Sequence, residues 1–262
     1  MASERQPRTE NVASVLKVFA VLEALAEDRR ASLAEIAQRA MTSKSTAHRL
    51  LQTMIDLGYV EQEGETDKYA LTLKLFSLGA RTLSGHSDLL RVADRAMGAL
   101  SRATGESVNL GIMDEREGRV AYIHGYASSY GLSMQSPLGL RNPLHSTSLG
   151  KALLAWRDEA EIRERLARME MPKLAPNTIT DPEALLDQLR RFRALGYAEE
   201  IEESEAGVRC MAVPVLDHVG KPAAAISISF PVFRFDVERK PEYVSLLKSA
   251  GAEASRALGH WG

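Results

Sequence analysis

Several features that define other protein classes are scarce or missing in this chain of 262 residues. A single cysteine, Cys210, excludes an internal disulfide and a cysteine-rich zinc site, and it suits a reducing cytoplasm. The first ten residues, MASERQPRTE, are polar and lack the apolar region of a secretory signal peptide. No apolar run approaches the ~20 residues that a membrane helix needs. These absences favour a cytoplasmic globular protein.

The chain also lacks an excess of charge of either sign. Its formal net charge is -2, and residues 1–83 hold 11 Lys and Arg against 11 Asp and Glu. Bulk charge therefore gives no sign of nucleic-acid binding, and any DNA-contacting surface must come from local charge distribution. The hydrophobic content of 45% and the charged content of 26% are ordinary for a globular protein, and the length allows two domains.

Sequence motifs of common catalytic and phosphate-binding sites are missing as well. The chain has no Gly-rich phosphate loop, no G-x-S-x-G and no H-E-x-x-H. We therefore assign no catalytic residue, no metal ligand and no cofactor, and we expect a protein that is not an enzyme. One enzymatic alternative uses Cys210 as a nucleophile or redox centre. No second cysteine is present to resolve an oxidised thiol, and no histidine pattern clearly pairs with Cys210.

What the chain does contain is a helix–turn–helix pattern within residues 32–60. Ser32 and Glu35 have the spacing of a capping box, which predicts the start of one helix. Ser43 follows a short turn and is placed to cap a second, longer helix, which Gly58 ends. One face of that second helix is apolar and should pack inward, through Ala47, Leu50, Leu51 and Met54.

The opposite face of the second helix carries groups that hydrogen-bond to base edges and phosphates. No acidic residue occurs from Ile36 to Ile55, so nothing in this window would repel a phosphate backbone. Arg49 has two open interpretations, because a guanidinium reads guanine bidentately or holds a phosphate. The predicted DNA-binding residues are Ser43, Lys44, Ser45, Thr46, His48, Arg49 and Gln52.

Flanking segments extend this motif to a winged helix. Two short extended runs, residues 59–62 and 68–71, flank a polar turn and predict a β-hairpin. Any unit of three packed helices can show a helix–turn–helix pattern, and the hairpin with the acid-free window favours DNA binding over that alternative. Before the motif, residues 11–26 predict an amphipathic helix capped by Asn11 or Ser14, with an inward stripe of Val15, Val18, Phe19, Leu22 and Leu25.

A linker helix is predicted after the hairpin, and Ser84-Gly85-His86-Ser87 breaks it. We therefore divide the chain into a winged helix-turn-helix DNA-binding domain (1–72), a linker helix (73–86) and a second domain (87–262). Strands mixed with helices, several of them joined by hairpin turns, predict an α+β second domain with an antiparallel sheet. A capping box with an early proline, Thr180-Asp181-Pro182-Glu183, is expected to start one helix, which Gly196 ends. The other expected helices are 87–104, 148–156, 159–169 and 237–258, and the expected strands are 107–113, 119–126, 132–136, 208–216 and 223–230.

Small polar groups stand within the apolar strands of this second domain. Ser227 and Ser229 share one face of a strand, and Cys210 and Ala212 share a face of its neighbour. The segment HSTSLGKALLA starts a helix whose first N–H groups are free to bind an anion. Together these features predict a pocket for a small carboxylic acid.

Taken singly, each of these groups has a simpler interpretation. A serine in a strand is usually hydrogen-bonded locally, and a lone cysteine usually behaves as a small hydrophobe. His124 and His145 suit a structural or surface position. The acidic run EEIEESE, which starts at Glu199, is typical of a solvated surface, with room for one carboxylate to turn inward and accept hydrogen bonds from hydroxyl groups.

These motifs together resemble the IclR family of bacterial transcription regulators. The resemblance lies in SLAEIAQRA, SKSTAHRLLQTMIDLGYV, STSLGKALLA, GYAEEIEESEAGVRCMAVPV and GKPAAAISISFP, and it spans essentially the whole chain. Within the family, stretches such as VLKVFAVLEAL and LRNPLHSTSLGKALLAWRD are most similar to repressors of pectin and hexuronate catabolism that respond to 2-keto-3-deoxygluconate.

The resemblance implies a GAF-like effector-binding domain, a homodimer often paired into a tetramer, and two kinds of partner, operator DNA and a small 2-keto acid. It also implies that backbone amides at Ser148 and Leu149 hold the effector carboxylate. Relatives tend to have Asp at the position of Glu200, whose side chain is one methylene longer. An aromatic or short keto acid is the alternative effector, although the polar side chains favour a hydroxylated one. The remaining implied pocket residues are Glu200, Cys210, Ser227 and Ser229.

Overall fold

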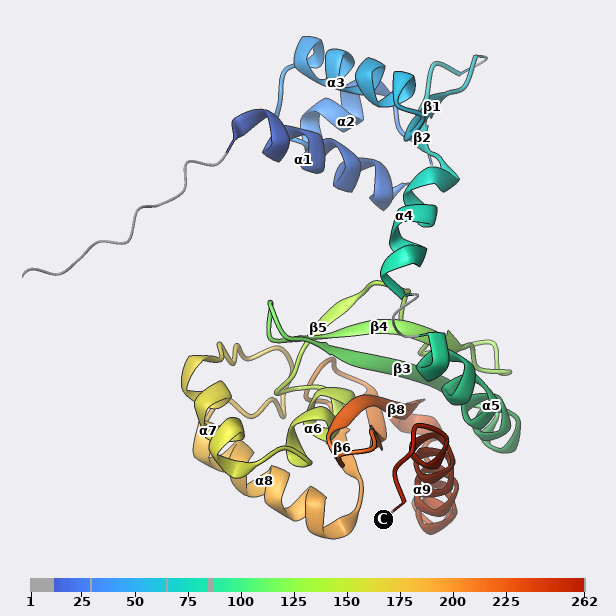
Figure 1. Ribbon diagram of the computed structural model, residues 1–262, viewed down its shortest axis with the longest axis vertical. Helices are drawn as coiled ribbons and strands as arrows, with labels where there is room; N and C mark the ends of the chain where they lie inside the picture. Colours follow the sequence, from blue (N-terminus) through green and yellow to red (C-terminus); the bar gives the residue numbers. More distant parts are fainter. Residues whose placement is uncertain (1–11, 29, 65, 84–86, 262) are drawn as a thin grey trace, which may run out of the picture. The chain divides into compact units, whose positions relative to one another are not determined.

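The computed structural model describes residues 12–28, 30–64, 66–83 and 87–261. The chain forms two compact units, residues 1–85 and residues 86–262, and Figure 1 shows the elements of each. Of the predicted break between them, Ser84, Gly85 and His86 lie outside the described residues. Among the helices described, we find none that is both long and apolar enough to span a membrane.

The first unit is a three-helix bundle followed by a β-hairpin and a further helix. Ser32 and Glu35 form the predicted capping box, and the Ser43 hydroxyl accepts from the Thr46 N–H at the start of the long helix. The hairpin is antiparallel, with Val60 opposite Leu71. The elements are α1 (Ala13–Glu27), α2 (Leu33–Arg39), α3 (Lys44–Asp56), β1 (Val60–Gln62), β2 (Tyr69–Leu71) and α4 (Leu73–Leu83).

The start of α1 differs from the prediction. Val12 occupies the N-cap position and makes no side-chain cap, whereas Ser14 lies inside the helix. Ser14 as a cap is therefore wrong, and Asn11 lies outside the described residues.

The predicted inward stripe of α1 is wrong in part. Leu25 is buried, and Val18 and Leu22 pack against the core of the unit. Val15 and Phe19, in contrast, are 49% and 58% exposed. They continue an apolar stripe with two other exposed side chains, Val12 and Leu16. Sequence periodicity identifies an apolar face, but it does not tell which part of that face the same chain covers.

The second unit is built on a six-stranded antiparallel sheet with the strand order β5-β4-β3-β8-β7-β6. Its elements are α5 (Ser87–Thr104), β3 (Ser107–Asp114), β4 (Arg119–Tyr126), β5 (Arg141–Pro143), α6 (Ser148–Ala155), α7 (Glu159–Arg168), α8 (Pro182–Leu195), β6 (Ala198–Ile201), β7 (Val208–Leu216), β8 (Pro222–Pro231), a 3-10 turn (Val232–Arg234) and α9 (Lys240–Ala257).

Helices cover both faces of this sheet, α5 and α9 on one and α6, α7 and α8 on the other (Figure 1). Ile226 and Ile228 point into the apolar core beneath α5 and α9. Because side chains alternate along a strand, Ser227 and Ser229 belong to the opposite face, the one that α6 covers. The predicted alternation along β8 is thus present in the structure.

The predicted strand at residues 132–136 is wrong. This segment is a loop whose N–H groups bond to side chains of β3 rather than to a neighbouring strand. Met134 N–H donates to Ser107 Oγ at 2.9 Å, and Ser136 N–H donates to Asn109 Oδ1 at 3.2 Å. The edge of β4 is paired instead with β5, a short strand that the sequence pattern did not indicate. The strand β6 was also missed, because its sequence AEEI reads as part of an acidic surface run.

A β-bulge in β4 sets which side chains face α6. Leu110 pairs with His124 and Gly111 pairs with Tyr122, so Ile123 is the extra residue. A bulge turns the side chains that follow it to the other face of the sheet. Tyr122 therefore packs with the core under α6, whereas His124 contacts Asp94 of α5 at 2.7 Å.

Candidate functional sites

The N-terminal half of α3 presents a polar surface to solvent. Lys44, Ser45, His48, Arg49 and Gln52 are all exposed, while Ala47, Leu51 and Met54 on the other face are buried. Among the described residues, the side chains of Lys44, His48, Arg49 and Gln52 form no hydrogen bond or ion pair with the protein. They are consequently available to an external partner.

Two other predicted contact residues serve the helix itself. The Ser43 hydroxyl accepts from the Thr46 N–H at 3.2 Å and donates to the Thr46 Oγ1 at 2.9 Å. A basic residue near this surface, Arg39, is also engaged, because it forms an ion pair with Asp28 at 2.6 Å. The free positive charge of the helix–turn–helix thus lies on α3, at Lys44 and Arg49.

A row of polar side chains crosses the sheet of the second unit beneath α6. Neighbouring strands each contribute one group, and three of these groups are connected. Cys210 Sγ of β7 donates to Ser229 Oγ of β8 at 3.2 Å, and Asn109 Nδ2 of β3 donates to the same oxygen at 3.2 Å. Glu200 of β6 lies directly opposite Cys210 in the strand register. The sheet thus brings together Glu200, Cys210 and Ser229, three of the predicted pocket residues.

Glu200 is a buried carboxylate, only 1% exposed, and the turn that follows β6 supplies it with donors. The Glu203 N–H donates to its Oε2 at 3.0 Å, and Ser204 Oγ donates to its Oε1 at 2.9 Å. Burial raises the pKa of Glu200, and these hydrogen bonds partly oppose that effect. Each carboxylate oxygen retains a further lone pair that can accept from a ligand hydroxyl.

Cys210 has the environment of a protonated thiol. Burial and the nearby Glu200 carboxylate raise its pKa well above the ordinary value. Since the thiolate is the reactive form of cysteine, this environment disfavours nucleophilic chemistry. Cys210 therefore suits a packing and hydrogen-bonding role.

The start of α6 is a buried helix N-terminus. Thr147 caps it by accepting from the Gly150 N–H at 3.1 Å. Among the described residues no acceptor is found for the N–H groups of Ser148 and Leu149. Two polar atoms just before the helix, Ser146 Oγ and His145 Nδ1, are buried without a hydrogen-bond partner. Buried polar atoms without hydrogen-bond partners are rare in proteins, so this segment has unused capacity for a polar ligand.

Sequence reasoning missed the residues of this row that come from β3 and β4. Asn109 holds the covering loop through Ser136 and also donates to Ser229. Tyr122 is buried, which raises its pKa to about 12, and Asn142 Nδ2 lies 3.4 Å from its hydroxyl. An asparagine within the apolar strand SVNLGIM is a signal that could have been noticed, whereas the bulge that turns Tyr122 inward leaves no trace in the sequence pattern.

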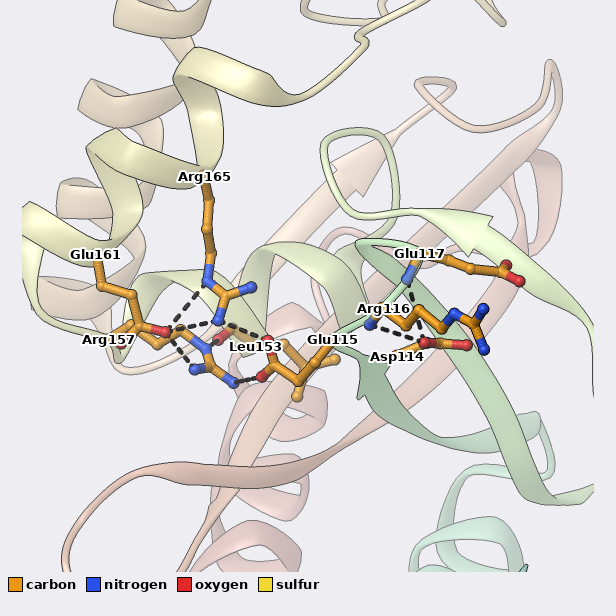
Figure 2. Close-up of polar contacts among 8 residues, drawn as sticks. All are labelled: Asp114, Glu115, Arg116, Glu117, Leu153, Arg157, Glu161 and Arg165. Atoms are coloured by element: carbon orange, nitrogen blue, oxygen red, sulfur yellow. Dashed lines mark hydrogen bonds and ion pairs between the residues drawn. The ribbon is translucent and has the colours of Figure 1, made fainter. Parts of the chain in front are cut away.

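A cavity in the second unit lies away from these residues. It has a volume of about 650 Å³ and lies between the β3–β4 turn and α7, with Arg116, Arg119 and Arg168 among its lining residues. Figure 2 shows that charged side chains at this cavity pair with one another. The Glu115 carboxylate accepts hydrogen bonds from the guanidinium groups of Arg165, at 2.6 Å, and Arg157, at 3.0 Å. None of the predicted effector-binding residues lines this cavity.

Comparison with known proteins gives two family matches. Residues 14–64 match the IclR helix-turn-helix domain, and residues 81–256 match the bacterial transcriptional regulator IclR C-terminal domain. The chain is 51% identical to the HTH-type transcriptional regulator KdgR of Escherichia coli strain K12, over 98% of this chain and 96% of that protein.

Solved structures are similar over nearly the whole chain. The crystal structure of the Thermotoga maritima IclR has a TM-score of 0.82 at 32% identity and covers 94% of this chain and 99% of that one. An IclR homologue from Microbacterium hydrocarbonoxydans, complexed with 4-hydroxybenzoate, has a TM-score of 0.79 at 28% identity, with 94% and 99% covered. The relatives are transcriptional regulators, so the chain has a regulatory rather than an enzymatic role. With a helix–turn–helix unit and an effector-domain fold matched in order along the sequence, the chain belongs to the IclR family of bacterial transcriptional regulators.

Proposed function

We propose that this protein represses genes of pectin and sugar-acid catabolism, and that a small 2-keto acid such as 2-keto-3-deoxygluconate controls its binding to operator DNA. The exposed polar face of α3 carries the DNA-binding half of the proposal, because four of its side chains, Lys44, His48, Arg49 and Gln52, have no partner among the described residues. The proposed DNA contacts are Ser43, Lys44, Ser45, Thr46, His48, Arg49 and Gln52. A protein that acts on bacterial chromosomal DNA works in the cytoplasm.

The effector half rests on two groups of atoms on the same side of the sheet. The N–H groups of Ser148 and Leu149 suit a carboxylate, because a helix N-terminus attracts negative charge. Glu200, Ser227 and Ser229 supply acceptors and hydroxyl groups to a hydroxylated carbon chain, with Cys210 beside them. We assign these six residues to the effector site, and the domain limits remain 1–72, 73–86 and 87–262.

A second copy of the chain is the partner we propose for the apolar stripe of α1. Val12, Val15, Leu16 and Phe19 are each at least 49% exposed and recur at helical spacing. Contiguous exposed apolar patches mark interaction surfaces. Leu73 and Phe76 of the linker helix, 81% and 70% exposed, support the same conclusion. In a homodimer, alone or paired into a tetramer, an effector can alter the spacing of two α3 helices and with it the fit to operator half-sites.

An aromatic acid is the second candidate effector, favoured by the solved relative complexed with 4-hydroxybenzoate. Thermal unfolding in the presence of 2-keto-3-deoxygluconate, glyoxylate, pyruvate and 4-hydroxybenzoate separates the two candidates. A ligand that binds only the native state raises the melting temperature by mass action. We expect the largest rise with 2-keto-3-deoxygluconate, and a response to the aromatic acid alone would overturn the sugar-acid assignment.

A further inference from the structure

Helix α6 carries a lysine whose side chain is entirely buried. Lys151 is 0% exposed and forms an ion pair with Glu203, whose side chain is 7% exposed. Burial lowers the pKa of Lys151, and the Glu203 carboxylate opposes that shift. Removing two charges from water is costly, so a buried ion pair contributes little net stability and suggests a role in fixing geometry.

Glu203 belongs to the turn that holds Glu200. The Glu203 N–H donates to Glu200 Oε2 at 3.0 Å, and the side chain of the same residue pairs with Lys151. The turn includes Glu202 at a φ of 53°, a left-handed conformation that is unfavourable for a residue with a β-carbon. Such conformations persist where the surroundings enforce them. Here the Thr178 hydroxyl bonds to the Glu203 carbonyl at 2.7 Å, and Lys151 holds the Glu203 side chain.

The same short helix therefore connects the two ends of the proposed effector site. Ser148 and Leu149, whose N–H groups are free, lie within one helical turn of Lys151. From Lys151 the connection passes through the Glu203 side chain and the Glu203 N–H to the carboxylate of Glu200. All three residues of this series are buried, with Lys151 0%, Glu203 5% and Glu200 1% exposed.

We propose that Lys151 is a positioning residue for effector recognition: through Glu203 it fixes the Glu200 carboxylate at a set separation from the N–H groups at the start of α6. This inference rests on the proposed effector site. A short acid such as pyruvate needs only the helix end of that site. A longer hydroxylated acid must reach both ends, so its binding depends on their separation.

The test replaces both charged partners with apolar residues of similar size, Lys151→Met with Glu203→Leu, because removing one partner alone would leave an unpaired buried charge. The affinities of 2-keto-3-deoxygluconate and of pyruvate are measured by calorimetry. We expect the sugar acid to bind the double variant about tenfold more weakly, because that is the effect of losing one hydrogen bond to a charged group. Pyruvate should bind the double variant with an affinity within about twofold of its affinity for the original protein. Equal changes for the two acids would overturn the proposal, because a general loss of structure affects both.

A second measurement needs no effector. Hydrogen exchange at the Glu203 amide reports its hydrogen bond to Glu200, and the Met211 amide in the central sheet reports global opening. We expect the double variant to exchange at least about tenfold faster at Glu203 relative to Met211. Unchanged relative protection would overturn the positioning role. If the original protein binds neither acid, the effector assignment fails, and the exchange measurement still decides whether Lys151 positions Glu200.

A matched control removes a different ion pair, partly buried, on the same side of the unit. Arg157 and Glu161 have side chains 10% and 26% exposed. Glu115, a second partner of Arg157, also pairs with Arg165 at 2.6 Å, so replacing Arg157 does not leave Glu115 without a positively charged neighbour. The variant Arg157→Met with Glu161→Leu should leave both the affinity ratio and the exchange at Glu203 unchanged. If this control shifts the ratio as far as the Lys151 variant does, the effect is not specific to Lys151 and the proposal is overturned.

Discussion

A β-carbon on Gly150 would lie 2.3 Å from the carbonyl oxygen of Leu144 and 2.5 Å from its α-carbon. The first turn of α6 thus rests directly on the backbone that follows β5. Because this contact is between main-chain atoms, neither side can yield by changing a rotamer. The N–H groups at the start of α6 are therefore held in one place relative to the sheet.

Gly150→Ala should lower the free energy of unfolding by about 1–3 kcal/mol, the range expected for overpacking. Helix propensity alone predicts the opposite sign, since alanine is better than glycine in a helix by about 1 kcal/mol. Urea unfolding decides between the two. Gly131→Ala is the control, because a β-carbon there meets nothing within 4 Å, and it should be nearly neutral. A stabilised Gly150→Ala protein would mean that α6 can move away from Leu144.

Arg49→Gln should weaken binding to an operator fragment by at least about tenfold, because the Arg49 side chain is exposed and has no partner in the part of the chain that the structure describes. The salt dependence of the operator affinity and the sequence specificity then show whether Arg49 contacts a phosphate or a base. Loss of a phosphate contact lowers the salt slope by about 1, whereas loss of a base contact relaxes sequence specificity. Fluorescence anisotropy at several salt concentrations measures both. Arg119→Gln removes the same charge from the second unit and should leave DNA affinity unchanged. If Arg119→Gln weakens DNA binding as much as Arg49→Gln does, the effect comes from the net charge of the protein and not from a contact of Arg49.

The two serines of β8 should behave differently. Ser229 Oγ accepts from Asn109 and from Cys210, so Ser229→Ala leaves the buried Asn109 amide and the half-buried Cys210 thiol without this acceptor and should cost about 1–3 kcal/mol of stability. The Ser227 side chain has no hydrogen bond to another described residue. Ser227→Ala should therefore change stability little while weakening effector binding. Chemical unfolding and calorimetry on both variants check this, and equal stability losses would show that Ser227 also has a structural role.

His145 should make stability depend on pH. Burial lowers its pKa from the usual value of 6.5, although its Nε2 donates to the Pro172 carbonyl. Between the lowered native pKa and 6.5 the unfolded chain binds more protons than the native state, so stability falls as pH drops below about 6.5. His145→Gln keeps a donor for Pro172 but cannot titrate. Its unfolding free energy should differ less between pH 7.5 and pH 5.5, and an unchanged difference would remove His145 as a source of acid sensitivity.

Local signals in the sequence predicted much of the first unit. The Ser32–Glu35 capping box, the Ser43 cap and the Gly58 stop are each encoded within a few residues, and the structure has all of them. The α1 stripe was partly misplaced, because periodicity shows which side chains share a face of the helix but not which of them the chain covers, and Val15 and Phe19 are exposed.

In the second unit, the features that the sequence did not predict arise from contacts between residues distant in the sequence and from the packing of turns. Residues 132–136 alternate like a strand, but the β3 side chains of Ser107 and Asn109 take their N–H groups. Glu200 turns inward because the N–H of Glu203 and the hydroxyl of Ser204 meet it there, which an acidic run does not reveal. The bulge at Ile123 places Tyr122 on the face of the sheet that α6 covers, and the sequence pattern does not reveal this bulge either.

We propose that α3 binds DNA and that an acid bound beneath α6 changes that binding. The most direct test is fluorescence anisotropy of the intact protein on a fragment of its own promoter region, with and without 2-keto-3-deoxygluconate. We predict salt-sensitive binding whose affinity the effector shifts at least about fivefold, in the usual range of allosteric coupling. Salt-sensitive binding that ignores 2-keto-3-deoxygluconate and every other keto acid, or no specific binding at all, would contradict it.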